Sequence, residues 1–400
     1  MSAQDAGPAA SPFFRLPREL RDEVYTLLFS PHSFRVDLPD DRVEYKYDLR
    51  PLRISRQIHD EARQVFRRLN TFVRIETPWP EAKQHISDEG RVPIVASDEN
   101  ATRFKAVHLH VCIEAFQYAF VEGNTHYLVI LADHLPAFCS MWYYSDLSHP
   151  GLNSHLNLVL TLQDPYAING TEKPLPASLK RRLLEPFRDI KGLNNMSVQG
   201  QGDEAIVQAV RDAQAVPYKS PEECLAEATR LKDEGNTALQ KSRFKDALRL
   251  YEEAFAAIHI VVAGKRRSIW ANAFFETHCR SGQYEGQYAQ LVRLVMRVKL
   301  VANTTLAYLK MEDYHMAKYW GMRSIQLMRE GMGIENDDDD EPMLGFAAAN
   351  EMGKIYYRTG LACRAMDERE QARKLLRIAA QYLPRDPQVQ AALASVALRI

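Results

Sequence analysis

Apolar residues recur with two different periods along the chain, and the first stretch has the helical one. Positions three and four residues apart predict one helix over 13–29 and a second over 53–66. Pro17 suits a first helical turn, and Glu19 suits the positive end of the helix. We expect both apolar stripes to pack inside their own domain. The residues predicted to face inward are Leu20, Val24, Leu27 and Leu28 in the first helix and Ile54, Ile58, Ala62 and Phe66 in the second.

Between residues 70 and 200 the period shortens to that of β-strands. Short apolar runs predict strands over 71–75, 106–113, 155–162 and 195–199. Helical patterns over 132–144 and 179–187 lie between them. This alternation predicts a small mixed sheet covered by helices.

From about residue 220 the pattern is helical throughout and repeats. Segments 228–261, 298–331 and 353–386 match the tetratricopeptide (TPR) pattern, in which small residues let paired helices approach closely. Residues 386–398 then read as a capping helix for the last repeat. The small, aromatic and proline positions in register are Gly235, Ala247, Tyr251 and Ala254, then Tyr308 and Ala317, then Gly360, Ala372, Ala379 and Pro384.

The repeats start at 228, 298 and 353, so insertions separate them. The first insertion, 263–297, is apolar and aromatic, and it fits either lengthened helices or a degenerate fourth repeat. The second contains the acidic run 335–341, which we expect to be a solvated loop.

The chain is therefore predicted to hold an α+β N-terminal domain followed by an all-α TPR helical-repeat domain. The expected divisions are a disordered tail over 1–12, the α+β domain over 13–200, a linker over 201–220 and the TPR domain with its capping helix over 221–400.

Composition narrows the classes of function. A net charge of -1 and a pI of about 6.9 give no global attraction to nucleic acid or to an anionic membrane. No apolar run is long enough for a membrane span, and the start lacks the features of a secretory signal, so we expect a cytoplasmic or nuclear protein. No nucleophile, base, phosphate-loop or cofactor motif is recognisable, which argues against an enzyme.

Metal-ligand spacings are also missing. The five cysteines are scattered and predict free thiols in a reducing compartment. His108 and His110 share one face of a predicted strand, but no carboxylate or thiol stands nearby at a matching spacing. We predict no metal site and no cofactor.

Two short segments carry a resemblance in the N-terminal half. Leu16-Pro17-x-Glu19-Leu20 and the stretch 55–62, Ser-Arg-Gln-Ile-His-Asp-Glu-Ala, resemble F-box-like domains of fungal proteins. The resemblance implies that Leu16, Pro17 and Leu20 can dock the adaptor of a cullin-type ubiquitin ligase. About twenty residues, 33–52, separate the two helices, which departs from a compact F-box.

The repeats carry a second resemblance, to TPR co-chaperones of the carboxylate-clamp type. Lys232 with Asn236, and Lys354 with Arg358, are spaced to share a helix face, and Asn303 lies between the two pairs in the chain. The resemblance implies that these five residues grip the acidic C-terminal tails of the 70-kDa and 90-kDa heat-shock chaperones. Cationic and amide donors suit the two carboxylates of a terminal aspartate.

These residues leave more than one function open. The leading interpretation is an interaction adaptor, or co-chaperone, with a clamp in the TPR groove. The alternative is a general TPR scaffold, or an F-box-type substrate adaptor of a ubiquitin ligase, that binds no chaperone. A fourth repeat over 263–297 would move Asn303 one layer away from Lys232 and favour the scaffold.

Overall fold

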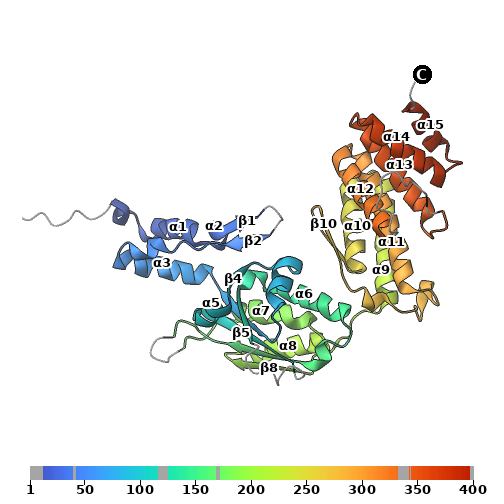
Figure 1. Ribbon diagram of the computed structural model, residues 1–400. Helices are drawn as coiled ribbons and strands as arrows, with labels where there is room; N and C mark the ends of the chain where they lie inside the picture. The colour runs from blue at the N-terminus through green and yellow to red at the C-terminus, as the bar shows by residue number, and fades with distance from the viewer. Residues whose placement is uncertain are drawn as a thin grey trace, which may run out of the picture. The chain divides into compact units, whose positions relative to one another are not determined.

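The computed structural model describes residues 12–38, 42–115, 125–167, 172–331, 342 and 344–396 (Figure 1). They form two compact units, one of residues up to 146 with 151–218 and one of 147–150 with residues from 219 onward. The predicted tail, except Pro12, and the acidic run 335–341 lie outside the described residues.

The first unit is built around a six-stranded mixed sheet. The strand order is β4-β6-β3-β5-β7-β8, with β3/β5 and β7/β8 parallel and the other neighbours antiparallel. Its strands are β3 (Phe72–Thr77), β4 (Ile94–Ser97), β5 (Val107–Ala115), β6 (His126–Leu131), β7 (Leu156–Leu162) and β8 (Asn195–Gly200).

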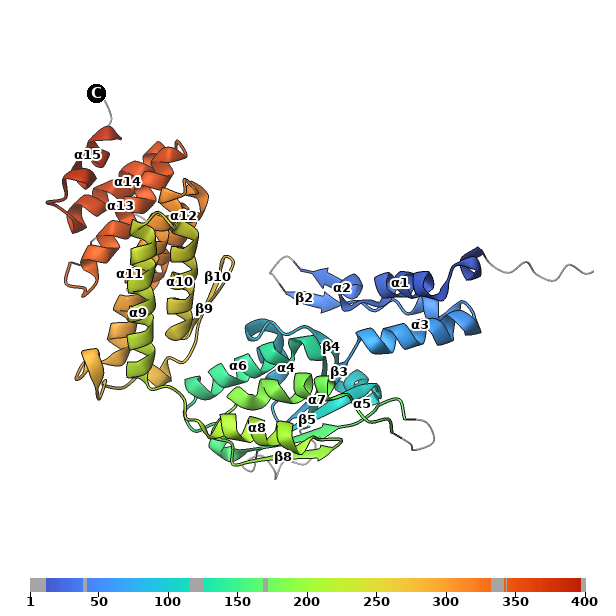
Figure 2. The same ribbon diagram turned by 180° about the vertical axis from the view of Figure 1, so that it is seen from behind.

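Successive side chains along each strand point to opposite faces, so the sheet has two different faces. Val73, Ile75, Leu109 and Val111 point to one face and form its main core. The helices that contribute to this core are α6 (Leu135–Ser148), α7 (Ala177–Leu184) and α8 (Glu204–Ala215), as Figure 2 shows. On the other face Phe72, Val129 and Leu131 pack against Ala101 of α5 (Asp98–Arg103).

The helix α8 replaces the linker predicted over 201–220. Asp203 caps the helix by accepting from the backbone N–H of Ile206. Ile206, Val207 and Val210 are buried in the core of the sheet. The predicted linker is therefore wrong over 204–215, because the apolar stripe of this segment completes the first unit.

The two N-terminal helices, α1 (Arg18–Phe29) and α3 (Arg56–Leu69), form a pair with α2 (Pro31–Phe34) and the short strands β1 (Arg35–Asp37) and β2 (Val43–Tyr45). Tyr25 and Phe29 of α1 pack with Ala62 and Val65 of α3.

The prediction that the apolar stripe of α1 is buried is wrong. Tyr25 and Phe29 are 2% and 0% exposed, whereas Leu20 and Leu27 are 44% and 74% exposed. Val24 and Leu28 are exposed as well. In the second helix region Ala62 is buried as predicted, but Ile54 is 69% exposed because it precedes the first turn of α3.

The second unit is a stack of antiparallel helix hairpins (Figure 1). The helices are α9 (Pro221–Gln240), α10 (Phe244–Ala257), α11 (Ala289–Lys310), α12 (Tyr314–Gly331), α13 (Ala349–Ala365), α14 (Arg369–Tyr382) and α15 (Pro387–Ser395). They share one hydrophobic core, and Val389 and Ala392 of α15 belong to it. Among the described residues, no helix combines the length and apolar character needed to cross a membrane.

The three hairpin turns repeat the same backbone conformation. Ser242, Glu312 and Asp367 each have φ near +60°, at 58°, 61° and 60°. Their separations, 312 − 242 = 70 and 367 − 312 = 55, equal those of the predicted repeat starts, 298 − 228 = 70 and 353 − 298 = 55. The repeat register read from the sequence is therefore present in the fold.

The first insertion is not a fourth repeat. Residues 260–269 form a β-hairpin of β9 (Ile260–Ala263) and β10 (Arg266–Ile269), and its turn contains Gly264 at φ 58°. Residues 289–297 lengthen α11, as one of the two predicted alternatives had it. The unit is thus helical with one added β-hairpin, and the prediction of an all-α domain needs that correction.

Candidate peptide-binding site

The five residues of the predicted clamp lie on the first helix of each hairpin. Lys232 and Asn236 lie on α9, Asn303 on α11, and Lys354 and Arg358 on α13. Because 263–297 adds no helix pair, α9 and α11 are direct neighbours, and α11 also contacts α13.

A shared hydrogen-bond acceptor joins α9 to α11. The Asn303 Nδ2 amide donates to Asn236 Oδ1 at 2.7 Å. The Tyr251 hydroxyl, on α10, donates to the same oxygen at 2.9 Å. Asn236 therefore has its carbonyl oxygen satisfied from inside the unit, and its amide N–H groups remain for another partner.

Arg358 extends this group to the third hairpin. Its Nη1 donates to the main-chain oxygen of Ala302 at 2.5 Å, next to Asn303 in the chain. Burial lowers the pKa of Arg358 to about 10, and the nearby Tyr251 opposes that shift. No described carboxylate forms an ion pair with this guanidinium, so a half-buried positive charge is left without a counterion.

The two lysines are not joined to this group. Lys232 Nζ lies 2.9 Å from Oδ1 of its exposed chain neighbour Asp233. Lys354 is half-buried one turn before Arg358 and forms no ion pair with any described residue. The structure thus brings Asn236, Asn303 and Arg358 together. The ammonium groups of Lys232 and Lys354 take no part in the hydrogen bonds that join these three residues.

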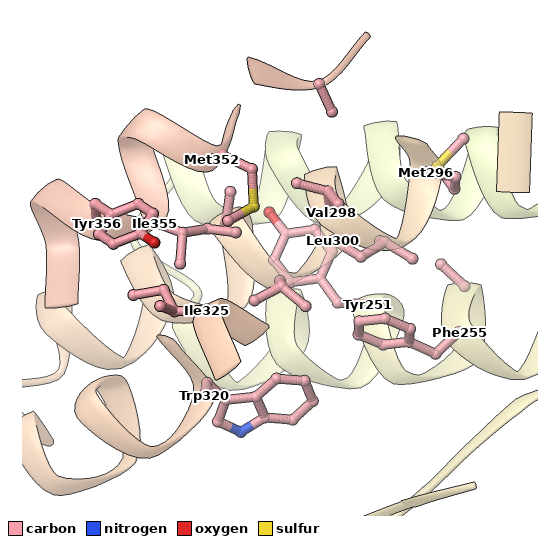
Figure 3. Close-up of a cluster of buried hydrophobic side chains, with 14 of the residues drawn as sticks. Tyr251, Phe255, Met296, Val298, Leu300, Trp320, Ile325, Met352, Ile355 and Tyr356 are labelled. Atoms are coloured by element: carbon pink, nitrogen blue, oxygen red, sulfur yellow. The ribbon is translucent and has the colours of Figure 1, made fainter. Parts of the chain in front are cut away.

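The position of Tyr251 depends on a glycine. A Cβ at Gly235 would lie 2.5 Å from the Tyr251 ring, so a larger residue would displace the ring. The ring is fully buried, in the same cluster as Leu300, Met352 and Ile355 (Figure 3). The small residue and the aromatic residue of the TPR pattern therefore position the hydroxyl that holds Asn236.

Sequence reasoning assigned Tyr251 only to packing and missed its contact with the site. Tyr251 belongs to no recognisable binding motif. Only the repeat register, which places α10 against α9, could have suggested its hydrogen bond to Asn236. The arrangement can offer amide and guanidinium donors to an anion, and it contains no paired nucleophile and base.

The histidines of β5 do not form a metal site with other described residues. His108 is buried, and burial lowers its pKa to about 4. His110 Nε2 lies 2.8 Å from Glu76 Oε2. No group of three or more histidine, cysteine, aspartate or glutamate residues in the described ranges could hold a metal ion.

Comparisons with known proteins add little. No model of a known family matches the chain, and no curated protein matches it. Among solved structures, it is similar to the C-terminal TPR-containing domain of a Plasmodium falciparum protein named as FK506-binding, with 18% identity over 44% of this chain and 91% of that chain. The TM-score is 0.29, so this likeness decides nothing about fold or activity.

Proposed function

We propose that this protein is an interaction adaptor whose helical-hairpin unit binds the C-terminal end of an acidic peptide. The observation that carries the proposal is the hydrogen-bonded group of Asn236 and Asn303, with the uncompensated guanidinium of Arg358 beside it. The ligand we propose is the Glu-Glu-Val-Asp tail of the 70-kDa and 90-kDa heat-shock chaperones, which would make the protein a cytoplasmic or nuclear co-chaperone without catalytic activity.

The charge of the group supports an anionic ligand. A half-buried cation without a counterion is costly in the free protein, and an incoming carboxylate offsets that cost. Hydrogen bonds to charged partners contribute about 1.5 to 3 kcal/mol each, enough for a terminal carboxylate to decide the affinity. The free N–H groups of Asn236 supply further donors.

Titration calorimetry with a peptide ending in Glu-Glu-Val-Asp tests the proposal. We expect saturable binding to the full chain that is lost when the terminal carboxylate is amidated. The amidated peptide has the same length and side chains, so it controls for general attraction to the groove. Equal binding of both peptides would leave the alternatives, a general TPR scaffold or an F-box-type adaptor that binds no chaperone.

A second interaction surface is favoured by one further observation. Leu16, Leu20, Val24, Leu27 and Leu28 are all exposed at the start of the first unit, although four of them form an apolar stripe on α1. Scattered exposed leucines need no explanation, but a contiguous stripe indicates a partner. We propose that this surface docks the adaptor of a cullin-type ubiquitin ligase, with Leu16, Pro17 and Leu20 in the contact.

A pull-down with the purified adaptor subunit tests this second proposal. Leu20→Asp and Leu27→Asp should abolish co-purification and leave the melting temperature unchanged, because both side chains already face water. Val216→Asp, at an exposed position outside α1, is the matched control and should bind like the wild type. Wild-type protein that never captures the adaptor would exclude this partner.

A further inference from the structure

Three arginines of the second unit, separate from the clamp residues, lie close enough to repel one another. They are Arg267 of β10, Arg297 of α11 and Arg323 of α12. The Arg267 guanidinium lies over the Trp320 ring, 4.0 Å from its centroid. Arg323 Nη1 donates to the Tyr319 hydroxyl at 3.4 Å. Arg297 lies one turn beyond Arg293 on α11.

Several nitrogens of this cluster have no acceptor among the described residues. Nε, Nη1 and Nη2 of Arg267 and Nε of Arg323 are buried without a hydrogen-bond partner. Arg297 is half-buried and forms neither an ion pair nor a hydrogen bond with any described residue. Burial and mutual repulsion lower the pKa of Arg267 to about 10, with Arg323 and Arg297 as the repelling charges.

Neighbouring Arg293, by contrast, is a buried arginine whose guanidinium has hydrogen-bond acceptors. Its guanidinium donates to the main-chain oxygens of Ile258 and His259 and to Asn272 Oδ1, which satisfies it. The three clustered arginines have no comparable set of acceptors. A cation–π contact with Trp320 does not replace hydrogen bonds, because a buried guanidinium has five N–H groups to satisfy.

We propose that Arg267, Arg297 and Arg323 form a binding site for a compact, multiply charged phosphate. Planar guanidinium groups bind phosphate oxygens through paired hydrogen bonds, and three of them close together match a small polyanion better than a single carboxylate. All three side chains are half-buried, and Arg297 has no nitrogen among the fully buried, unpartnered ones. Arg267 sits on a hairpin whose two strands pair only with each other in the described part of the chain, and such a ribbon can shift to admit a ligand.

Calorimetry with sodium pyrophosphate and the full chain tests the proposal. We expect saturable binding to one site that weakens as sodium chloride rises, because salt screens the charges. Sulfate at equal ionic strength should bind at least tenfold more weakly, because it carries fewer charges. Absence of pyrophosphate binding at millimolar concentration would overturn the proposal, as would equal binding of sulfate.

Variants then locate the site. Arg297→Gln and Arg267→Gln should each weaken pyrophosphate binding at least tenfold, in keeping with the loss of a charged hydrogen bond. Arg249→Gln is the matched control, because Arg249 is exposed on α10 and already paired with Glu253. Unchanged affinity in both cluster variants would place the bound anion elsewhere.

The melting temperature without ligand separates a binding role from a structural one. Removing one of three mutually repelling cations should leave the melting temperature of Arg297→Gln unchanged or higher. A lower melting temperature together with retained pyrophosphate binding would make the cluster structural and overturn the proposal. A phosphoserine peptide that binds more tightly than pyrophosphate would overturn the assignment to a small polyanion.

Discussion

Lys354 and Arg358 lie one helical turn apart on α13, yet their surroundings differ. The Arg358 guanidinium is held by the main-chain oxygen of Ala302, whereas Lys354 has no ion-pair partner among the described residues. Both side chains are half-buried. Replacing Arg358 therefore removes an internal hydrogen bond together with the charge, so Lys354 gives the cleaner test of the clamp.

Lys354→Ala should weaken binding of the Glu-Glu-Val-Asp peptide roughly tenfold to hundredfold, the effect of losing a hydrogen bond to a charged group. Its melting temperature should stay within a degree or so, because no hydrogen bond or ion pair with a described residue is lost. Calorimetry and thermal melts measure the two quantities. Lys245→Ala, at an exposed position on α10, serves as the control and should change neither. A large loss of stability with unchanged affinity would make Lys354 structural.

The close approach of Gly235 to the Tyr251 ring leads to a second prediction about a single residue. Gly235→Ala should lower the free energy of unfolding by about 1 to 3 kcal/mol, because the new Cβ overpacks the buried Tyr251 ring. That clash outweighs the gain of up to about 1 kcal/mol that alanine has over glycine in a helix. Gly331→Ala meets no atom within 4 Å and should be neutral or stabilising. Equal effects in denaturant melts would mean that Tyr251 can move aside.

At the scale of elements, the sequence predicted where helices and strands lie better than which face they bury. In α1, Leu20, Val24, Leu27 and Leu28 form one apolar stripe, while Tyr25 and Phe29 lie on the adjacent face. Helical periodicity fits both faces, and only the position of α3 decides between them. The choice is tertiary, so the chosen stripe was wrong although the helix was right.

The strands β4 and β6 were not predicted, because their sequences show no clear strand period. The predicted strands over 71–75, 106–113, 155–162 and 195–199 correspond to β3, β5, β7 and β8. The four-residue β4 is too short to show a period, and β6 is a continuous apolar run that periodicity cannot assign to either type. The hairpin of β9 and β10 did have a detectable pattern, the β-branched pair Val261 and Val262 before Gly264.

The pairing of α1 with α3 predicts a pH dependence. Glu61 accepts from Arg21 Nη2 at 2.8 Å and from the Tyr25 hydroxyl at 3.1 Å, and the Arg21 hydrogen bond is the largest cause that lowers the pKa of Glu61 to about 2 from its usual 4.5. Because the folded-state pKa is depressed, the stabilisation is fully present above pH 4.5 and is lost as the pH falls toward about 2.

Amide exchange in α1 and α3, corrected for intrinsic rates, should therefore quicken over that acidic range. Glu61→Gln should remove about 1.5 kcal/mol of local stability at neutral pH, near the lower limit for charged hydrogen bonds, and should flatten the pH dependence. Glu23→Gln is the control, since Glu23 is exposed on α1, the helix that pairs with α3. A wild-type profile that stays flat between pH 5 and about 2 would contradict the assignment.

At the scale of the whole molecule, each unit has hydrophobic cores of its own. The core of the second unit draws only on residues from Cys224 to Val396, and the main core of the first draws only on residues from Val73 to Val210. Sequence alone predicted two domains from the change of period, but it wrongly assigned residues 204–215 to the linker. An amphipathic segment between two domains can pack on either, and nothing in its own pattern says which.

Separate cores predict separate folding. A fragment of residues 219–400 should unfold cooperatively on heating and should bind the Glu-Glu-Val-Asp peptide with the affinity of the full chain, because Lys232, Asn236, Asn303, Lys354 and Arg358 all lie within it. Its affinity should also fall with salt as that of the full chain does, since the same solvent-accessible charges are screened. Circular dichroism and calorimetry on both proteins measure this. A fragment that folds but loses affinity would show that the first unit contributes to peptide binding.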